Sequence, residues 1–217
     1  MAQEKRMMKE RDELLDHPGM RRALGFIQGE VWSVNPLVFF SYHLVGCMNN
    51  WHLDVTKECL DVIQKCRSYN PSVQLRPPSD SLPFSGMTIN MGSPKNPGVV
   101  TGIHLDCMNY PFCPCVVYSS GSFDHTKGGH FVLHDSKRLV EFPPGCAIYV
   151  SSAVTRHSNV PVQEGEARQS FTMYMAGALV RFAQGGCQLL HGRTLHNSNV
   201  GWSTLERVGG EWVVQRT

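Results

Sequence analysis

Residues 99–106 read Val-Val-Thr-Gly-Ile-His-Leu-Asp, a β-branched run that ends in a histidine and an aspartate two positions apart. The run predicts a strand over Val100–Leu105. Successive side chains of a strand alternate between its two faces, so His104 and Asp106 would point in the same direction. An imidazole nitrogen and a carboxylate oxygen on one face can bind the same metal ion.

Other short strands are predicted on both sides of this run, each bounded by Gly, Pro or Ser turn residues. They cover Met87–Met91, Cys115–Ser119, Gly129–His134, Ala147–Ser151 and Ser170–Met175. Short strands at near-regular spacing are typical of a sandwich or a jelly-roll barrel. The expected fold class is therefore mainly β with flanking α-helices around a jelly-roll core.

Helical periodicity is found on the N-terminal side of this core. It predicts helices over Glu4–Leu15 and Met20–Gln28, and a third from Asp54, placed as a possible N-cap, to Cys66. We expect one domain: a helical support and loop at 1–85, the jelly-roll core at 86–176, and a helix and loop region at 177–217.

Composition limits the classes of function. The chain has 217 residues, 41% hydrophobic and 18% charged, and a net charge of +2 (20 basic minus 18 acidic residues), so it should fold and carries no global charge excess for DNA or membranes. No apolar run reaches the roughly 18 residues of a membrane span, and the N-terminus has no signal-peptide pattern. We expect a monomer that is not secreted, with its eight cysteines reduced in the nucleus or the cytoplasm.

A histidine followed two positions later by an acidic residue means little by itself, because about 0.8 chance occurrences of this pattern are expected from the composition. The chain has two, His52-Leu53-Asp54 and His104-Leu105-Asp106, and helix capping already explains Asp54. The second frame gains a third ligand in His157, 53 residues after His104. Two histidines and one carboxylate form the facial triad of non-haem iron(II) sites.

An arginine completes the pattern. Arg168 follows His157 by 11 residues, and by strand parity it shares a face with Ser170 and Tyr174. A planar guanidinium beside a hydroxyl is a bidentate receptor for a carboxylate. If the pattern began at His52 instead, Cys115 would stand where the arginine is needed.

The pattern H-x-D, then H, then R-x-S resembles the iron(II)- and 2-oxoglutarate-dependent dioxygenases over roughly residues 99–175. The resemblance implies a double-stranded β-helix with Fe(II), 2-oxoglutarate and O2 as cofactor and cosubstrates. It implies His104, Asp106 and His157 as iron ligands. It also implies that Arg168 and Ser170 bind the distal carboxylate of 2-oxoglutarate.

Within that superfamily, H-L-D-C-M-N-Y at 104–110 and R-Q-S-F-T-M-Y at 168–174 resemble the TET and J-binding-protein branch, which oxidises methylated pyrimidines in DNA. The resemblance implies that Asn109 hydrogen-bonds a flipped base and that Tyr174 stacks on it, as an extruded base requires. It also implies that His130 touches 2-oxoglutarate. The expected partner is then methylated duplex DNA, with 5-methylcytosine as the first candidate base and N6-methyladenine as the second, and the expected compartment is the nucleus.

The chain departs from that branch at Ala176, where TET enzymes carry a histidine. Cys113-Pro114-Cys115 lacks the second cysteine pair of a zinc site, so two buried thiols are expected there. Basic residues could contact phosphate or simply be solvated: Lys5, Arg6, Lys9, Arg11, Lys127, Lys137 and Arg138.

Two other functions stay open. One is a 2-oxoglutarate dioxygenase that hydroxylates a peptide side chain or a small metabolite. The other is a non-catalytic jelly-roll binding module.

Overall fold

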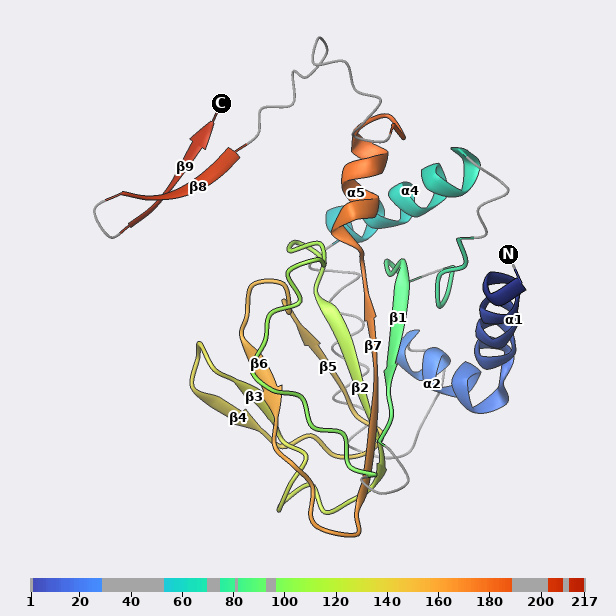
Figure 1. The fold of residues 1–217 in the computed structure, drawn as a ribbon, viewed down its shortest axis with the longest axis vertical. Coiled ribbons are helices and arrows are strands. Elements are labelled where there is room, and N and C mark those ends of the chain that lie inside the picture. The colour runs from blue at the N-terminus through green and yellow to red at the C-terminus, as the bar shows by residue number, and fades with distance from the viewer. Residues whose placement is uncertain are drawn as a thin grey trace.

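Short strands separated by turns form two antiparallel sheets that make up a jelly-roll core (Figure 1). The computed structural model describes residues 2–28, 53–69, 75–80, 82–92, 97–188, 203–208 and 211–216. Within these residues every strand pairing is antiparallel, and helices pack beside the sheets. The predicted fold class, mainly β with flanking helices and a jelly-roll core, is confirmed.

The larger sheet has four strands in the order β1-β7-β2-β5. Their bounds are Gly86–Asn90 for β1, Cys115–Ser122 for β2, Ala147–Val150 for β5 and Ala167–Tyr174 for β7. The strand β7 lies in the middle, and alternation divides its side chains between two environments. Phe171 and Met173 pack into the main hydrophobic core, while Arg168, Ser170 and Tyr174 line a pocket, as the parity argument predicts.

The smaller sheet has three short strands in the order β4-β3-β6. These are Phe131–Leu133 for β3, Arg138–Val140 for β4 and His157–Asn159 for β6. A second hydrophobic cluster joins this sheet to the larger one and contains Val117, Phe131, Phe142 and Val150. The pocket lies between the two sheets, because residues of β1, β2, β7, β3 and β6 all line it.

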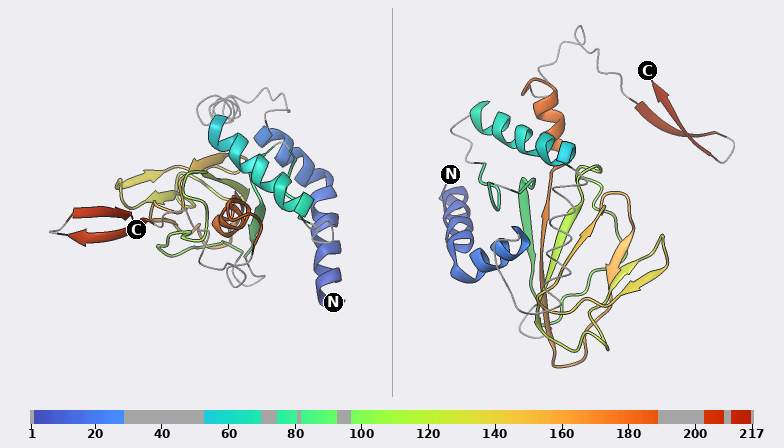
Figure 2. Two further views of the ribbon diagram at one scale, coloured as in Figure 1. Left: turned by 90° about the horizontal axis from the view of Figure 1, so that it is seen from above. Right: turned by 180° about the vertical axis from the view of Figure 1, so that it is seen from behind.

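Helices cover the other face of the larger sheet. They are α1 (Ala2–Asp16), α2 (Pro18–Gln28), α4 (Leu53–Tyr69) and α5 (Gly177–Gln184). Figures 1 and 2 show α1 and α2 beside β1, and α4 beside α5 near one end of the sheet. Their buried side chains join those of β2 and β7 in one core that includes Leu15, Leu24, Cys59, Ile63, Val116, Met173 and Val180. No helix within the described ranges is long and apolar enough to cross a membrane.

Gly121 in β2 is required by a close approach of the neighbouring strand. It pairs with Arg168 of β7 and has a φ of 121°, where a side chain is strained. A Cβ atom at this position would lie 2.2 Å from the carbonyl oxygen of Ala167. Only glycine therefore lets β2 and β7 pair at the position of Arg168.

Several predicted elements differ from the structure. No regular strand forms over Val100–Leu105; the segment is extended and has only isolated bridges, Gly98 with Arg168 and His104 with His157. Asp54 lies in the first turn of α4 and is not its N-cap, because the helix begins at Leu53. The C-terminal region also contains a hairpin that the sequence did not predict, β8 (Ser203–Val208) paired with β9 (Glu211–Arg216). His52 lies outside the described residues.

Candidate functional site

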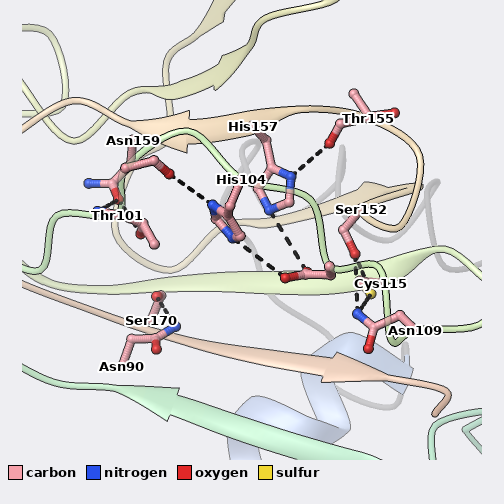
Figure 3. Close-up of polar contacts among 12 residues, drawn as sticks. Asn90, Thr101, His104, Asn109, Cys115, Ser152, Thr155, His157, Asn159 and Ser170 are labelled. Atoms are coloured by element: carbon pink, nitrogen blue, oxygen red, sulfur yellow. Dashed lines mark hydrogen bonds and ion pairs between the residues drawn. The ribbon is translucent and has the colours of Figure 1, made fainter. Parts of the chain in front are cut away.

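The three predicted metal ligands lie together at one side of the pocket (Figure 3). Nε2 of His104 is 3.5 Å from Oδ1 of Asp106, and Nε2 of His157 is 3.8 Å from Oδ2 of the same carboxylate. All three ligand atoms lie within 4.8 Å of one another. Backbone hydrogen bonds hold the two histidines opposite each other, since the N–H of each donates to the carbonyl of the other at 3.1 and 3.0 Å. The structure therefore brings together a cluster that the sequence spreads over 54 positions.

Both imidazoles are oriented by their own backbone. Nδ1 of His104 is 2.8 Å from the carbonyl oxygen of Gly102, and Nδ1 of His157 is 2.9 Å from that of Thr155. A carbonyl only accepts, so each Nδ1 carries the proton and donates it, and each Nε2 keeps a free lone pair for a metal. Burial lowers the pKa of His157, which favours the neutral form that coordinates. The Phe131 ring stacks on the His157 ring, with 5.5 Å between the ring centres, and supports the orientation of the imidazole.

This donor set suits iron(II). Two neutral imidazoles and one carboxylate occupy one side of an ion and leave positions open for a chelating ligand and dioxygen, as in non-haem iron(II) oxygenases. The exposed fractions of the ligand side chains are 36% for His104 and 28% for Asp106, against 6% for His157. The cluster is therefore open on one side, toward the pocket.

The pocket has a volume of about 310 Å³ and contains a buried cation. Arg168 is only 2% exposed, and its Nε has no hydrogen-bond partner among the described residues. The guanidinium lies 5.9 Å from the centre of the Phe142 ring, and burial lowers its pKa. Burying an unpaired charge is costly, so a site of this kind is built to receive an anion.

Ser170 lies two residues further along the same face of β7 and is 6% exposed. Its Oγ accepts a hydrogen bond of 3.4 Å from Nδ2 of Asn90, which leaves the hydroxyl proton of Ser170 free to donate to a ligand. Asn90 also lines the pocket and was not found from the sequence. Its position directly opposite Ser170 in the β1–β7 register could have indicated it.

The two residues expected to contact substrate also line the pocket. The ring of Tyr174 lies against Gly86, where a Cβ would be 3.1 Å from the tyrosine hydroxyl oxygen. The Asn109 amide is partly used within the protein: Nδ2 donates to Sγ of Cys115 at 3.2 Å and to Oγ of Ser152 at 3.4 Å. Its Oδ1 accepts no hydrogen bond from the part of the chain that the structure describes.

His130 does not line the pocket. It immediately precedes β3, whose first residue Phe131 faces the pocket, so alternation turns the His130 side chain the other way. The side chain is 9% exposed, and its Nδ1 has no hydrogen-bond partner within the described ranges. Contact between His130 and 2-oxoglutarate stays a prediction.

The cysteine pair and several basic residues have ordinary structural partners. Cys113 and Cys115 are both buried, as expected; the first donates to the carbonyl of Pro83, and the second accepts from Ser152. Lys127 pairs with Asp124 at 3.0 Å. On α1, Arg6 pairs with Glu10 at 2.7 Å and Lys9 with Glu13 at 3.5 Å, all with exposed side chains.

Comparison with known proteins finds partial structural similarity to solved structures. No protein-family model matches the chain, and no curated protein sequence does. Among solved structures, NgTET1 in complex with 5mC DNA matches 51% of this chain with 17% identity and a TM-score of 0.38; the match spans 42% of that chain. The viral collagen prolyl hydroxylase vCPH from Paramecium Bursaria Chlorella virus-1, in its 2OG complex, matches 52% of this chain and 69% of its own, with 15% identity and a TM-score of 0.30. At these values the function has to be inferred from the site itself.

Proposed function

We propose that this protein is an iron(II)- and 2-oxoglutarate-dependent oxygenase. The observation that carries the proposal is the buried Arg168, whose Nε has no hydrogen-bond partner among the described residues, in the same 310 Å³ pocket as an open cluster of His104, Asp106 and His157. A metal site and an anion receptor in one cavity fit a cosubstrate that chelates a metal at one end and carries a free carboxylate at the other. 2-Oxoglutarate is such a molecule.

The residues present can be assigned roles that fit these groups. His104, Asp106 and His157 would hold iron(II), which supplies the activation of dioxygen that couples oxidative decarboxylation of 2-oxoglutarate to insertion of one oxygen atom into a C–H bond, giving succinate and CO2. Arg168 would pair two N–H groups with the distal carboxylate, and the Ser170 hydroxyl would donate a further hydrogen bond. Val117 and Phe131 form apolar pocket wall, which excludes water around the cosubstrate.

The substrate we propose is a methylated base flipped out of DNA. Tyr174 offers a ring on which a base can stack, and bases gain roughly 1 to 3 kcal/mol from such contacts. Asn109 Nδ2 is held by Cys115 and Ser152, so its Oδ1, which accepts no hydrogen bond from the described residues, is oriented as an acceptor. The exocyclic amino groups of cytosine and adenine are donors, whereas thymine presents a carbonyl. These contacts support 5-methylcytosine, with N6-methyladenine second, and DNA as a substrate would place the protein in the nucleus.

One observation favours the alternative of a peptide side chain or a small metabolite. Of the described residues that line the pocket, Arg168 is the only cation, and it is buried. Beside the metal ligands, Ile103, Leu105 and Met108 are apolar and exposed, at 64%, 41% and 68%. A surface that follows a phosphate backbone would be expected to carry Lys or Arg there.

Succinate release tests the proposed activity. Purified protein with Fe(II), ascorbate and 2-oxoglutarate should release succinate, and an Asp106→Ala variant, which lacks the carboxylate ligand, should not. A wild-type protein that neither binds 2-oxoglutarate nor releases succinate would be a non-catalytic binding module.

Nucleoside mass spectrometry after incubation with methylated duplex separates the two substrate classes. Oxidised 5-methylcytosine or N6-methyladenine is expected, and a gel shift should weaken steeply between two salt concentrations, because phosphate contacts release counterions. Asn109→Ala should reduce base oxidation more than it reduces uncoupled succinate release, since the amide acts on the base. If methylated duplex is never oxidised while succinate is released, the peptide or metabolite alternative replaces the DNA substrate.

A further inference from the structure

The segment that carries two of the three metal ligands is not part of a regular sheet. Residues 97–106 have isolated bridges in place of a ladder. At one end the N–H of Val99 donates to the carbonyl of Arg168 at 3.2 Å. At the other end His104 exchanges two backbone hydrogen bonds with His157. Between these ends the backbone contributes one long contact, from the N–H of Asn159 to the carbonyl of Thr101 at 3.4 Å.

The side chain of Asn159 fills this gap (Figure 3). Its Oδ1 accepts from the backbone N–H of Thr101 at 2.8 Å and from the Thr101 hydroxyl at 2.7 Å. Its Nδ2 donates to the carbonyl of Val99 at 2.9 Å and to its neighbour Val160 at 3.2 Å. Asn159 is 7% exposed, so these bonds are formed away from bulk water, where an unmet donor or acceptor is costly.

We infer that Asn159 is a positioning residue that holds the metal end and the anion end of the pocket in register. It lies two residues after His157, on the same face of β6. The residues it binds sit between the two ends: Val99 is bonded to the backbone of Arg168, and Thr101 precedes His104 by three residues. The side-chain amide of Asn159 therefore ties two backbone segments to β6. One precedes the metal ligand His104, and the other is bonded to Arg168. This inference rests on the proposed iron and 2-oxoglutarate site.

Only an amide meets these demands. One end of the side chain must accept two hydrogen bonds from Thr101, and the other must donate to the Val99 carbonyl. Asn159→Asp keeps the shape and the acceptors but sets a carboxylate oxygen against the Val99 carbonyl oxygen. Asn159→Asp should therefore disturb the position of the segment around Val99 and Thr101, although it hardly changes the volume of the side chain.

The first measurement is hydrogen exchange of metal-free protein, which does not depend on any activity. In Asn159→Asp, the amides of residues 99–104 should exchange at least about tenfold faster than in the wild type, while those of the β2–β7 ladder keep their rates. Val62→Ala is the matched control: Val62 is 6% exposed in α4, outside the pocket, so it lowers stability without touching the segment. Equal exchange of residues 99–104 in Asn159→Asp and in the wild type overturns the inference.

The second measurement is the affinity for Mn(II), a redox-inert substitute for iron, by calorimetry. Substitution of a residue that orients metal ligands typically lowers metal affinity by about 10- to 100-fold. We expect a Kd at least about tenfold higher in Asn159→Asp than in Val62→Ala, even if both have the same Tm, and a weaker affinity for 2-oxoglutarate as well. The same Kd in both variants would show that Asn159 is merely structural.

A milder pair of variants covers the case in which Asn159→Asp does not fold. Thr101→Val removes one of the three hydrogen bonds between the Asn159 side chain and the segment, and Thr101→Ser restores the hydroxyl, so the second should lose less Mn(II) affinity than the first. Equal losses would count against the inference. If the wild type itself binds no Mn(II), the proposed function fails, and the exchange rates still decide the role of Asn159.

Discussion

Replacing Arg168 by methionine should make the ligand-free protein more stable and much less responsive to 2-oxoglutarate. A buried ion costs several kcal/mol even after the surroundings relax. The attraction between the guanidinium and the Phe142 ring, 5.9 Å away, offsets about 1 to 2 kcal/mol of this. With Arg168 2% exposed and its Nε unbonded within the described ranges, the net cost is about 1 to 3 kcal/mol. In a chain of this size that corresponds to a Tm about 2 to 12 °C higher in Arg168→Met.

The ligand should reverse this order. At 2-oxoglutarate concentrations 1,000-fold above Kd, binding stabilises the wild type by about 4.1 kcal/mol, which exceeds the cost of the buried charge, while Arg168→Met, which keeps only the contact with the metal, gains far less. Thermal unfolding of both proteins with Mn(II), with and without 2-oxoglutarate, measures the crossover. Arg168→Lys keeps the charge but loses the paired donors, so calorimetry should show an affinity several-fold weaker. The reasoning fails if Arg168→Met melts well below the wild type without ligand, or if 2-oxoglutarate raises both melting temperatures equally.

Three further results are expected. Asp106→Ala should weaken Mn(II) binding at least about a hundredfold, because the carboxylate lies beside both histidines. Circular dichroism and the Tm of the metal-free protein should stay near the wild type, because the side chain is 28% exposed. Unchanged Mn(II) binding would remove Asp106 from the metal site. Tyr174→Ala should weaken productive binding of methylated duplex about tenfold or more through lost stacking, seen as a higher KM, and a KM like the wild type's would make Tyr174 a core residue. Hydrogen bonds from the Thr126 hydroxyl, Lys127 and the Thr126 amide lower the pKa of Asp124 to about 2; its stabilising contribution is thus present above the ordinary carboxyl value of 3.8 and is lost as pH falls toward 2. An NMR titration of the carboxyl carbon checks this, with Thr126→Val expected to raise the midpoint and a wild-type midpoint near 3.8 contradicting it.

That the candidate metal and anion residues lie together could be predicted, because strand periodicity places them. His104 and Asp106 are separated by two positions, as are Arg168 and Ser170, and in extended chain that spacing fixes a common face whether or not the chain is paired. This is why the ligand cluster forms although no strand forms over Val100–Leu105. A β-branched run looks the same whether its hydrogen bonds go to a neighbouring strand or, as here for Val99 and Thr101, to the side chain of Asn159.

Other features depend on contacts that sequence spacing does not encode. The strands β4 and β6 have three residues each, too few for an alternating pattern to stand out. The partners of Asn109 are Cys115 and Ser152, 6 and 43 positions away, so the sequence cannot show which end of the amide is free. Phe131 lines the pocket and the neighbouring His130 does not, a difference that depends on packing and that sequence spacing does not encode.

Gly121 has a consequence for how this site could be re-engineered. Saturation mutagenesis should tolerate many residues along the exposed end of β2, yet none at Gly121, where any Cβ would meet the Ala167 carbonyl at 2.2 Å. Gly121 does not line the pocket, so its intolerance would look puzzling in a library screened only for activity. A designer who wants the proposed oxygenase site to accept a different anion can vary Ser170 or Asn90, which line the pocket, but the starting sequence has to keep this glycine for the Arg168 guanidinium to remain in its place.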